Sequence, residues 1–167
     1  MIASPWTSSL QRLLECGTRI SRHRSTGPRF DGEAVGITFD TNFIIDLLRS
    51  DRLAVAKAKE IETRGDTRFL TAPVLYEITA GLLFARSRSE AAAFRAFASR
   101  LTVLPFDESS SVKAAEIRAE LMRLGRSKGH LDTMIAGIVI QGGHTLVTRD
   151  RDLMEISQAV GLTVEGY

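Results

Sequence analysis

Four acidic residues stand at positions where a simple solvent-exposed charge is not expected. Asp40 and Asp150 each come at the end of a short apolar run that is typical of a buried strand. Glu77 lies among apolar neighbours with helical spacing, and Asp132 opens the most apolar helical stretch of the chain. Carboxylates that converge without cations repel one another, and a bound divalent cation relieves that repulsion. An oxygen-only cluster suits Mg²⁺ or Mn²⁺, and water held by such an ion can act as the nucleophile in phosphodiester hydrolysis.

Each acid also has a structural interpretation that involves no chemistry. Asp40 and Asp150 could cap the helices that follow them, because Asp is among the preferred N-cap residues. Asp132 could interact with a helix dipole, and Glu77 could lie on a solvent-exposed helix face. The four acids together are harder to explain in this way than any one of them alone, so both interpretations stay open at this point.

The elements that position these acids alternate between strands and helices. Apolar, β-prone runs predict strands at about residues 36–40, 68–71, 101–105, 144–148 and 162–164. Apolar spacing of three and four predicts helices at about residues 43–48, 51–63, 73–85, 89–99, 107–124, 131–141 and 153–159. This alternation predicts an α/β fold, a three-layer α/β/α sandwich around a mainly parallel sheet. Ligands of such sheets bind beyond the carboxyl ends of the strands, where Asp40 and Asp150 are expected.

Capping residues and apolar spacing also predict where helices begin and which faces they bury. Ser89 and Asp107 are expected N-caps, and Gly137 is small enough to let its helix approach a neighbour closely. The expected inward residues of the helix that begins at Ser89 are Ala91, Phe94, Phe97 and Ala98. Those of the helix that begins at Asp107 are Val112, Ala115, Ile117, Leu121 and Leu124.

Length and composition bound the class of protein. The 167 residues fit one domain with a hydrophobic core, and 44% hydrophobic and 25% charged residues are ordinary for a globular protein. The single cysteine, Cys16, excludes an internal disulfide and a cysteine-rich zinc site. No apolar run approaches the roughly 20 residues of a membrane-spanning helix. A cytoplasmic protein without a membrane partner is therefore expected.

Charge divides the chain into two parts. Five arginines against one glutamate give residues 1–30 a net charge of +4, which leaves −2 of the total of +2 for the remainder. The pI near 9.0 therefore comes from this segment and does not by itself indicate nucleic-acid binding. Residues 1–34 are interpreted as a flexible N-terminal extension, with an organelle transit peptide as the alternative. Residues 35–167 are interpreted as the folded domain.

The motifs around the four acids resemble those of PIN-domain ribonucleases and, more narrowly, of VapC-type toxins of toxin–antitoxin pairs. The Asp-Thr-Asn motif alone is weak, but all four motifs in the same order are specific, and the resemblance covers about residues 35–167. The motifs are Phe39-Asp40-Thr41-Asn42, Glu77, Leu131-Asp132-Thr133-Met134-Ile135-Ala136 and Leu146-Val147-Thr148-Arg149-Asp150-Arg151-Asp152-Leu153.

The resemblance implies a PIN-like fold and an endoribonuclease that depends on Mg²⁺ or Mn²⁺. The enzyme would cleave single-stranded or loop RNA and leave 3′-hydroxyl and 5′-phosphate ends. The catalytic, metal-binding acids would be Asp40, Glu77, Asp132 and Asp150.

The residues beside the acids would hold them in place. The resemblance implies that Thr41 or Asn42, and Thr148, orient the acids by hydrogen bonds from outside the ligand set. Many bacterial members of the family carry Asn where Asp150 stands, so Asp152 is kept as the alternative fourth acid.

RNA and proteins are the partners that the resemblance implies. Basic residues near the acids could contact RNA phosphates, although ordinary solvated side chains are the alternative for each. These residues are Lys128, Arg126, Arg149 and Arg151, with Arg49 after the first helix. Trp6, Tyr76 and Tyr167 are candidates for base stacking. A cognate antitoxin is expected to lie in a groove near the acids, and a homodimer is also expected. Residues 82–84 and 91–99 are candidate apolar surface for it, with packing in the core as the favoured alternative.

Three other functions remain open at this point. A housekeeping PIN nuclease of RNA processing would lack a neighbouring antitoxin gene. A non-catalytic PIN-like module that binds RNA or protein would neither bind Mn²⁺ nor cleave RNA. A receiver-like phosphoacceptor domain also gathers acids at strand ends, but it needs an acidic pair after the first strand, where this chain has Thr41 and Asn42.

Overall fold

The computed structural model describes residues 35–167, so the predicted extension 1–34 lies outside the described residues. The strands are β1 (Ile37–Phe39), β2 (Arg68–Thr71), β3 (Thr102–Leu104), β4 (Thr145–Val147) and β5 (Val164–Glu165). The helices are α2 (Thr41–Leu48), α3 (Arg52–Arg64), α4 (Ala72–Phe84), α5 (Arg88–Ala98), α6 (Glu108–Arg123), α7 (His130–Gln141) and α8 (Arg151–Val160). The predicted alternation of strands and helices is confirmed. In this part of the chain, no helix is long and apolar enough to cross a membrane.

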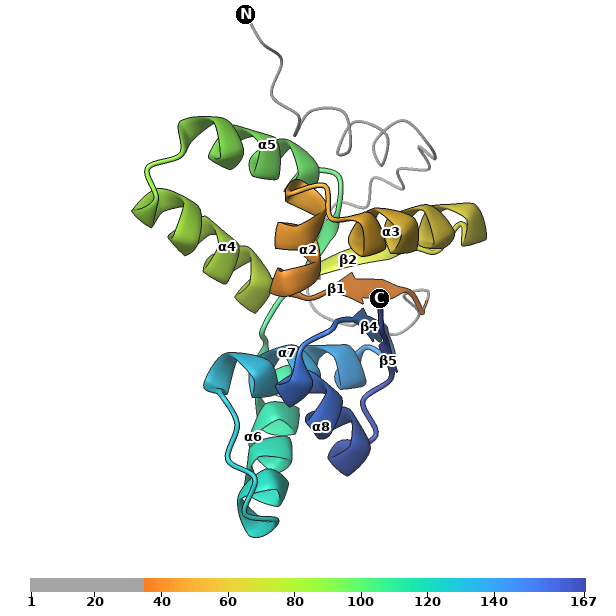
Figure 1. The fold of residues 1–167 in the computed structure, drawn as a ribbon. Helices are drawn as coiled ribbons and strands as arrows, with labels where there is room; N and C mark the ends of the chain where they lie inside the picture. Colours follow the sequence, from red (N-terminus) through yellow and green to blue (C-terminus); the bar gives the residue numbers. More distant parts are fainter. Residues whose placement is uncertain (1–34) are drawn as a thin grey trace, which may run out of the picture.

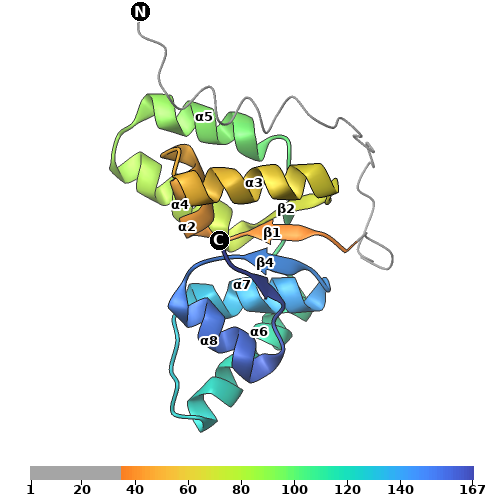
Figure 2. The same cartoon turned by 45° about the vertical axis from the view of Figure 1, so that its right-hand side comes forward.

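The strands form one parallel sheet in the order β3-β2-β1-β4-β5. Helices α2 to α5 lie on one side of the sheet and α6 to α8 on the other, as both views show (Figures 1 and 2). The predicted three-layer α/β/α sandwich is therefore confirmed. Phe39 at the end of β1 is in register with Val147 at the end of β4. The two residues that follow, Asp40 and Thr148, consequently leave the sheet side by side at its carboxyl edge.

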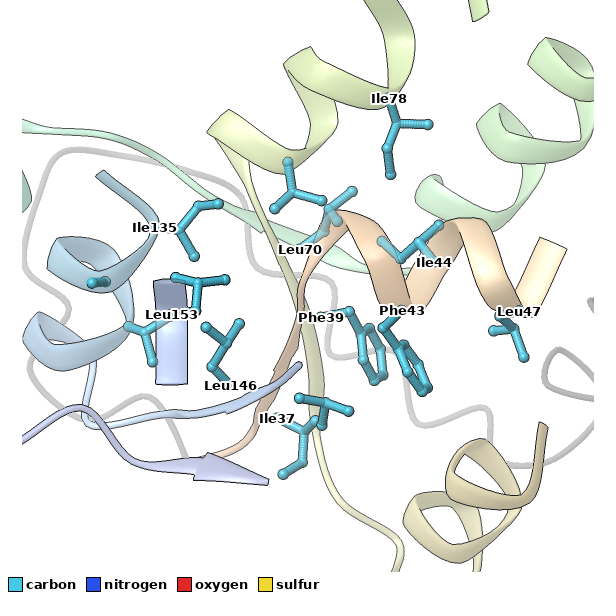
Figure 3. Packing of buried hydrophobic residues seen from close by; sticks show 14 of the residues in the cluster. Ile37, Phe39, Phe43, Ile44, Leu47, Leu70, Ile78, Ile135, Leu146 and Leu153 are labelled. Atoms are coloured by element: carbon cyan, nitrogen blue, oxygen red, sulfur yellow. The ribbon is translucent and has the colours of Figure 1, made fainter. Parts of the chain in front are cut away.

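Large apolar side chains fix the turn from β1 into α2. The rings of Phe39 and Phe43 stack with their centroids 5.0 Å apart (Figure 3). Phe43 and Ile44 are fully buried on α2, and Leu146 is fully buried on β4. Burying such a side chain stabilises the fold by roughly 1.5–3 kcal/mol. The core therefore holds the start of α2 rigidly against the ends of the two central strands.

Helices α6 and α7 pack closely because Gly137 has no side chain. A Cβ atom at Gly137 would lie 2.7 Å from the carbonyl oxygen of Ser110 and 2.9 Å from the Cβ of Ala114. The predicted close approach at Gly137 is confirmed. This contact also turns Ser110 and Ala114 inward, which determines which face of α6 is buried.

The predicted faces and ends of two helices need correction. In α6 the prediction for Val112, Ala115 and Leu124 was wrong, because these residues are exposed. Ile117 and Leu121 are buried as predicted, together with the small residues that meet Gly137. Ser89 was wrongly predicted as an N-cap: α5 already begins at Arg88, and Ser87 takes the cap position without a side-chain cap bond.

Candidate functional site

The carboxylate of Asp40 lies at the junction of β1 and α2, where it caps the helix. Its Oδ1 accepts the backbone N–H of Thr41 at 2.7 Å, and its Oδ2 accepts the hydroxyl of Thr148 at 2.9 Å. The residue is only 4% exposed. Burial raises the pKa of Asp40 to about 6, and the charges of Asp150 and Glu77 add to the rise, although the two hydrogen bonds oppose it. The structure therefore holds an acid where its ionised form is costly.

Asp150 both caps a helix and faces Asn42. Its Oδ1 accepts the backbone N–H groups of Asp152 at 2.8 Å and Leu153 at 3.2 Å, which makes it the N-cap of α8. Its Oδ2 lies 3.3 Å from the side-chain nitrogen of Asn42. The backbone N–H of Asp150 also donates to the hydroxyl of Thr148 at 2.9 Å. Thr148 thus links the acid after β4 to the acid after β1.

Glu77 reaches the same edge of the sheet from α4. The hydroxyl of Thr41 donates to its Oε2 at 2.6 Å, across 36 residues of sequence. Glu77 is exposed, so the alternative prediction, that it lies on a solvent-exposed face of its helix, is confirmed for its burial. The hydrogen bond nonetheless turns the carboxylate of Glu77 toward Thr41, the residue next to Asp40.

Asp132 enters from the first turn of α7. Burial raises its pKa, and the charges of Asp150, Asp152 and Glu77 raise it further, while a hydrogen bond from the backbone N–H of Gly129 opposes the rise. Gly129 makes room for this carboxylate, because a Cβ atom there would lie 2.6 Å from Oδ2 of Asp132. Asp132 therefore shares the electrostatic field of the other acids.

The four predicted acids are thus coupled at one edge of the sheet, and their oxygens are the ligands that Mg²⁺ and Mn²⁺ prefer. Within residues 35–167, no three acids, histidines or cysteines stand close enough to enclose an ion directly. Mg²⁺ keeps several of its waters and is usually bound through one or two carboxylates, so an open cluster fits this ion. The hydroxyl of Thr71, at the end of neighbouring β2, is buried and has no hydrogen-bond partner among the described residues. A buried hydroxyl without a protein partner is the kind of group that an ordered water satisfies.

A pocket of about 460 Å³ opens beside the cluster. It is lined by Asn42, Arg149, Asp150, Arg151 and Asp152. This lining places acids and guanidinium groups around one depression, which is the combination that a phosphate ester needs if it is to approach carboxylates.

Lys128 distinguishes the two candidates for the fourth acid. Its ammonium group lies 2.7 Å from Oδ1 of Asp152 and also pairs with Glu155, and its side chain is only 10% exposed. These ion pairs fasten the loop before α7 to α8 and neutralise part of the charge of Asp152. Oδ2 of Asp150 meets only the amide of Asn42 among the described residues, so no cation neutralises this carboxylate there as Lys128 does Asp152. Lys128 itself is engaged within the protein, unlike the exposed Arg126 and Arg151.

The sequence interpretation missed Asp46 and its contacts with Arg149 and Tyr167 near the site. Asp46 is buried on α2 and binds Arg149, with Nη2 of the arginine 2.9 Å from Oδ2 of the acid. Tyr167 was a candidate for base stacking, but it donates its hydroxyl to Asp46 at 2.7 Å, and its ring packs edge-on against Phe43. An acid within the apolar run 43–48 was the one available signal, because a carboxylate is rarely buried without a partner.

Comparisons with known sequences agree with the motifs. A family model described as PIN domain matches residues 37–158. The tRNA(fMet)-specific endonuclease VapC of Salmonella typhimurium is 38% identical over 71 residues, which cover 42% of this chain and 52% of the relative. The enzyme of the same name from Shigella flexneri is 37% identical over 76 residues, which cover 46% and 56%. The chain thus spans about half the length of these curated relatives.

Solved structures share the fold over a larger part of the chain. VapBC2 from Rickettsia felis, bound to a promoter DNA fragment, matches with a TM-score of 0.69 at 23% identity and covers 78% of this chain and 98% of that chain. DNA-bound VapBC from Salmonella typhimurium matches with a TM-score of 0.63 at 27% identity and covers 80% and 98%.

Proposed function

The chain belongs to the PIN domain family, and on that premise we propose that it is a metal-dependent endoribonuclease, the toxin of a toxin–antitoxin pair. Its similarity to two VapC endonucleases named as specific for tRNA(fMet) supports RNA as the substrate class. Its similarity to solved VapBC complexes supports the toxin assignment.

The observation that carries the proposal is the buried carboxylate of Asp40 among other acids. Its pKa of about 6 means that the folded protein resists the ionised form that neutral pH imposes. Neither Glu77 nor Asp150 can relieve this cost, because both are acids. A divalent cation relieves it directly, so the arrangement favours metal binding over a purely structural role.

In this proposal the ligands of Mg²⁺ or Mn²⁺ are Asp40, Glu77, Asp132 and Asp150, with Asp152 as the alternative to Asp150. A bound ion of this kind lowers the pKa of water and offsets negative charge on a phosphate. The chain itself orients the acids: Thr148 holds Asp40, Thr41 holds Glu77 and Asn42 faces Asp150. Such orienting bonds typically account for 10- to 100-fold in metal affinity or activity.

The RNA strand enters, in this proposal, along the pocket beside the acids. Arg149 and Arg151 line that pocket and can offset phosphate charge as the strand approaches. Arg126 is exposed in the loop before α7 and can contact the strand farther away. Lys128 contributes less, since two acids already bind its ammonium group.

The decisive experiment is cleavage of a pool of structured RNAs by the pure protein with Mg²⁺, with Mn²⁺ and with EDTA, beside Asp40→Asn. We expect cuts that need metal and that vanish in the variant. RNA cleavage that persists in EDTA would refute metal dependence. A folded protein that does not bind Mn²⁺ and does not cleave any RNA would instead support the non-catalytic binding module.

The toxin assignment is tested by expression in bacteria. We expect growth arrest from the wild-type protein, none from Asp40→Asn, and rescue by the product of a small neighbouring gene. Sedimentation of the pure protein tests the proposed homodimer, for which the exposed Leu83 and Phe84 on α4 provide apolar surface. A protein that cleaves RNA but has no such neighbouring gene would be a housekeeping nuclease.

A further inference from the structure

Arg149 is held beside the acids by two side chains that the proposed function does not use. Its Nη2 lies 3.0 Å from Oδ1 and 2.9 Å from Oδ2 of Asp46. Its guanidinium carbon lies over the ring of Tyr167, 5.6 Å from the centroid. The hydroxyl of Tyr167 donates to Oδ2 of the same aspartate at 2.7 Å. The three groups therefore bind one another, and we call Asp46 and Tyr167 the arginine anchor.

The anchor is itself fixed by the core. Asp46 is 7% exposed and lies on α2, one helical turn after Asn42. The ring of Tyr167 meets the buried ring of Phe43 edge-on, with centroids 5.0 Å apart. Helix α2 thus holds the segment after β4 at two points, Asn42 against Asp150 and Asp46 against Arg149. A guanidinium anchored in this way cannot swing freely as a solvated arginine does.

The anchor leaves part of the guanidinium available. Within residues 35–167, Nη1 and Nε of Arg149 have no hydrogen-bond partner, and the side chain is 48% exposed. Arg149 lines the pocket beside the acids and directly precedes Asp150. A planar guanidinium with free N–H groups binds phosphate oxygens in a defined geometry. Because the anchor removes side-chain freedom in advance, less entropy is lost when a phosphate binds.

We propose that Asp46 and Tyr167 are positioning residues, which aim the free N–H groups of Arg149 at a phosphate of the RNA strand beside the cleaved bond. This inference rests on the proposed function and adds a role for residues outside the acid cluster. It also ranks the arginines of the pocket, because Arg151 is exposed and has no anchor among the described residues. Arg149 should therefore contribute more to RNA binding than a neighbour of equal charge.

The matched pair Arg149→Gln and Arg151→Gln tests this ranking, because both variants remove one positive charge from the same pocket. With the best-cleaved RNA of the pool and Mg²⁺, we expect Arg149→Gln to raise KM about tenfold, as for a lost charge-assisted hydrogen bond. We expect about twofold for Arg151→Gln, as for an exposed charge. The slope of log affinity against log salt should fall by about 0.7 for a phosphate contact on single-stranded RNA. Equal effects in the two variants would overturn the ranking.

The anchor is tested by Asp46→Asn and Tyr167→Phe. Removal of a negative charge should by itself strengthen RNA binding. If Asp46 affected RNA only through its charge, Asp46→Asn would therefore lower KM. Loss of the anchor predicts the opposite, and we expect KM to rise about threefold with kcat little changed. Tyr167→Phe keeps the ring under Arg149 and removes only the hydroxyl, so it should raise KM less, by about twofold. A purely structural role would lower the active fraction, and hence kcat, without a change in KM.

Binding measured apart from cleavage separates this inference from the proposed function. The same variants are compared in an Asp132→Asn background, by fluorescence anisotropy with a short labelled single-stranded RNA. A wild-type protein that cleaves RNA, with Arg149→Gln no weaker than Arg151→Gln, would overturn the inference and leave the nuclease intact. A protein that does not cleave but loses affinity with Arg149→Gln and Asp46→Asn would overturn the nuclease alone. No cleavage and no RNA binding would overturn both.

Discussion

Asp40→Asn should abolish cleavage and at the same time stabilise the metal-free protein. The pKa of Asp40 rises from 3.8 to about 6, a difference of about two pKa units, so its ionised form costs the fold up to about 3 kcal/mol. Asparagine keeps an acceptor for the backbone N–H of Thr41 but presents an amide to Thr148, which forfeits about 1 kcal/mol or more. We therefore expect a net gain of about 1–2 kcal/mol in the free energy of unfolding at pH 7.5.

The assay is urea unfolding in EDTA, with Asp51→Asn as the matched control. Asp51 is also an N-cap, with its Oδ1 accepting the N–H groups of Leu53 and Ala54, but it is less buried than Asp40. Asn and Asp are nearly equivalent as caps, so the control should change stability by less than about 0.5 kcal/mol. The comparison of Asp40→Asn with Asp51→Asn therefore isolates the effect of removing a buried charge from the effect of changing an N-cap.

The pH dependence of this gain has a definite sign. A protonated Asp40 is favoured by the fold, so the stability that it contributes is fully present below pH 3.8 and is lost as the pH rises through about 6. The advantage of Asp40→Asn should therefore be largest above pH 6 and shrink toward pH 4. At one hundred times its dissociation constant, Mg²⁺ should stabilise the wild-type protein by about 2.7 kcal/mol and the variant by less. A variant less stable than wild type at pH 7.5 in EDTA, with Asp51→Asn unchanged, would refute the reasoning.

Three further substitutions test the site and the fold that supports it. Gly129→Ala should lower cleavage about tenfold with little loss of stability, because its Cβ displaces the carboxylate of Asp132; wild-type kinetics would show that this carboxylate need not be held there. Gly137→Ala should cost about 1–3 kcal/mol in urea unfolding, since its Cβ meets the backbone of α6 in a close-packed contact. Thr148→Val removes the hydrogen bond that lowers the pKa of Asp40, so the pKa of this carboxyl in the metal-free protein should rise above about 6 in an NMR titration; an unchanged pKa would show that the bond to Thr148 does not set it.

The sequence predicted the acids of the site because their signals are local. Asp40 and Asp150 each stand where an apolar run meets a helix. Both the apolar run and the helix cap can be recognised from the residues next to each acid. Parallel pairing of β1 with β4 then brings the two acids together, with Thr148 between them. The order of the motifs indicated the family, but it was the register of two short strands that set the contacts among the acids.

The arginine anchor was not predictable in this way. The bond from Arg149 to Asp46 spans 103 residues and that from Tyr167 to Asp46 spans 121, and nothing in the local sequence of any of them specifies the other two. Similarly, the buried face of α6 is set by its contact with Gly137, so small residues turn inward where apolar spacing had favoured Val112. In both cases a tertiary contact decides between side chains that local patterns treat alike.

Capping and chemistry, which the sequence presents as rival interpretations of Asp40 and Asp150, are compatible in the folded protein. A carboxylate has two oxygens, and one oxygen of each residue is bound to backbone N–H groups at the start of a helix. These bonds fix the direction of the second oxygen, which meets Thr148 in one case and Asn42 in the other. A cap thus supplies the rigidity that a metal ligand needs. Asp51 caps α3 in the same way, but it is not among the acids whose charges raise the pKa of Asp40 or Asp132, so a cap becomes a candidate ligand only where several acids converge.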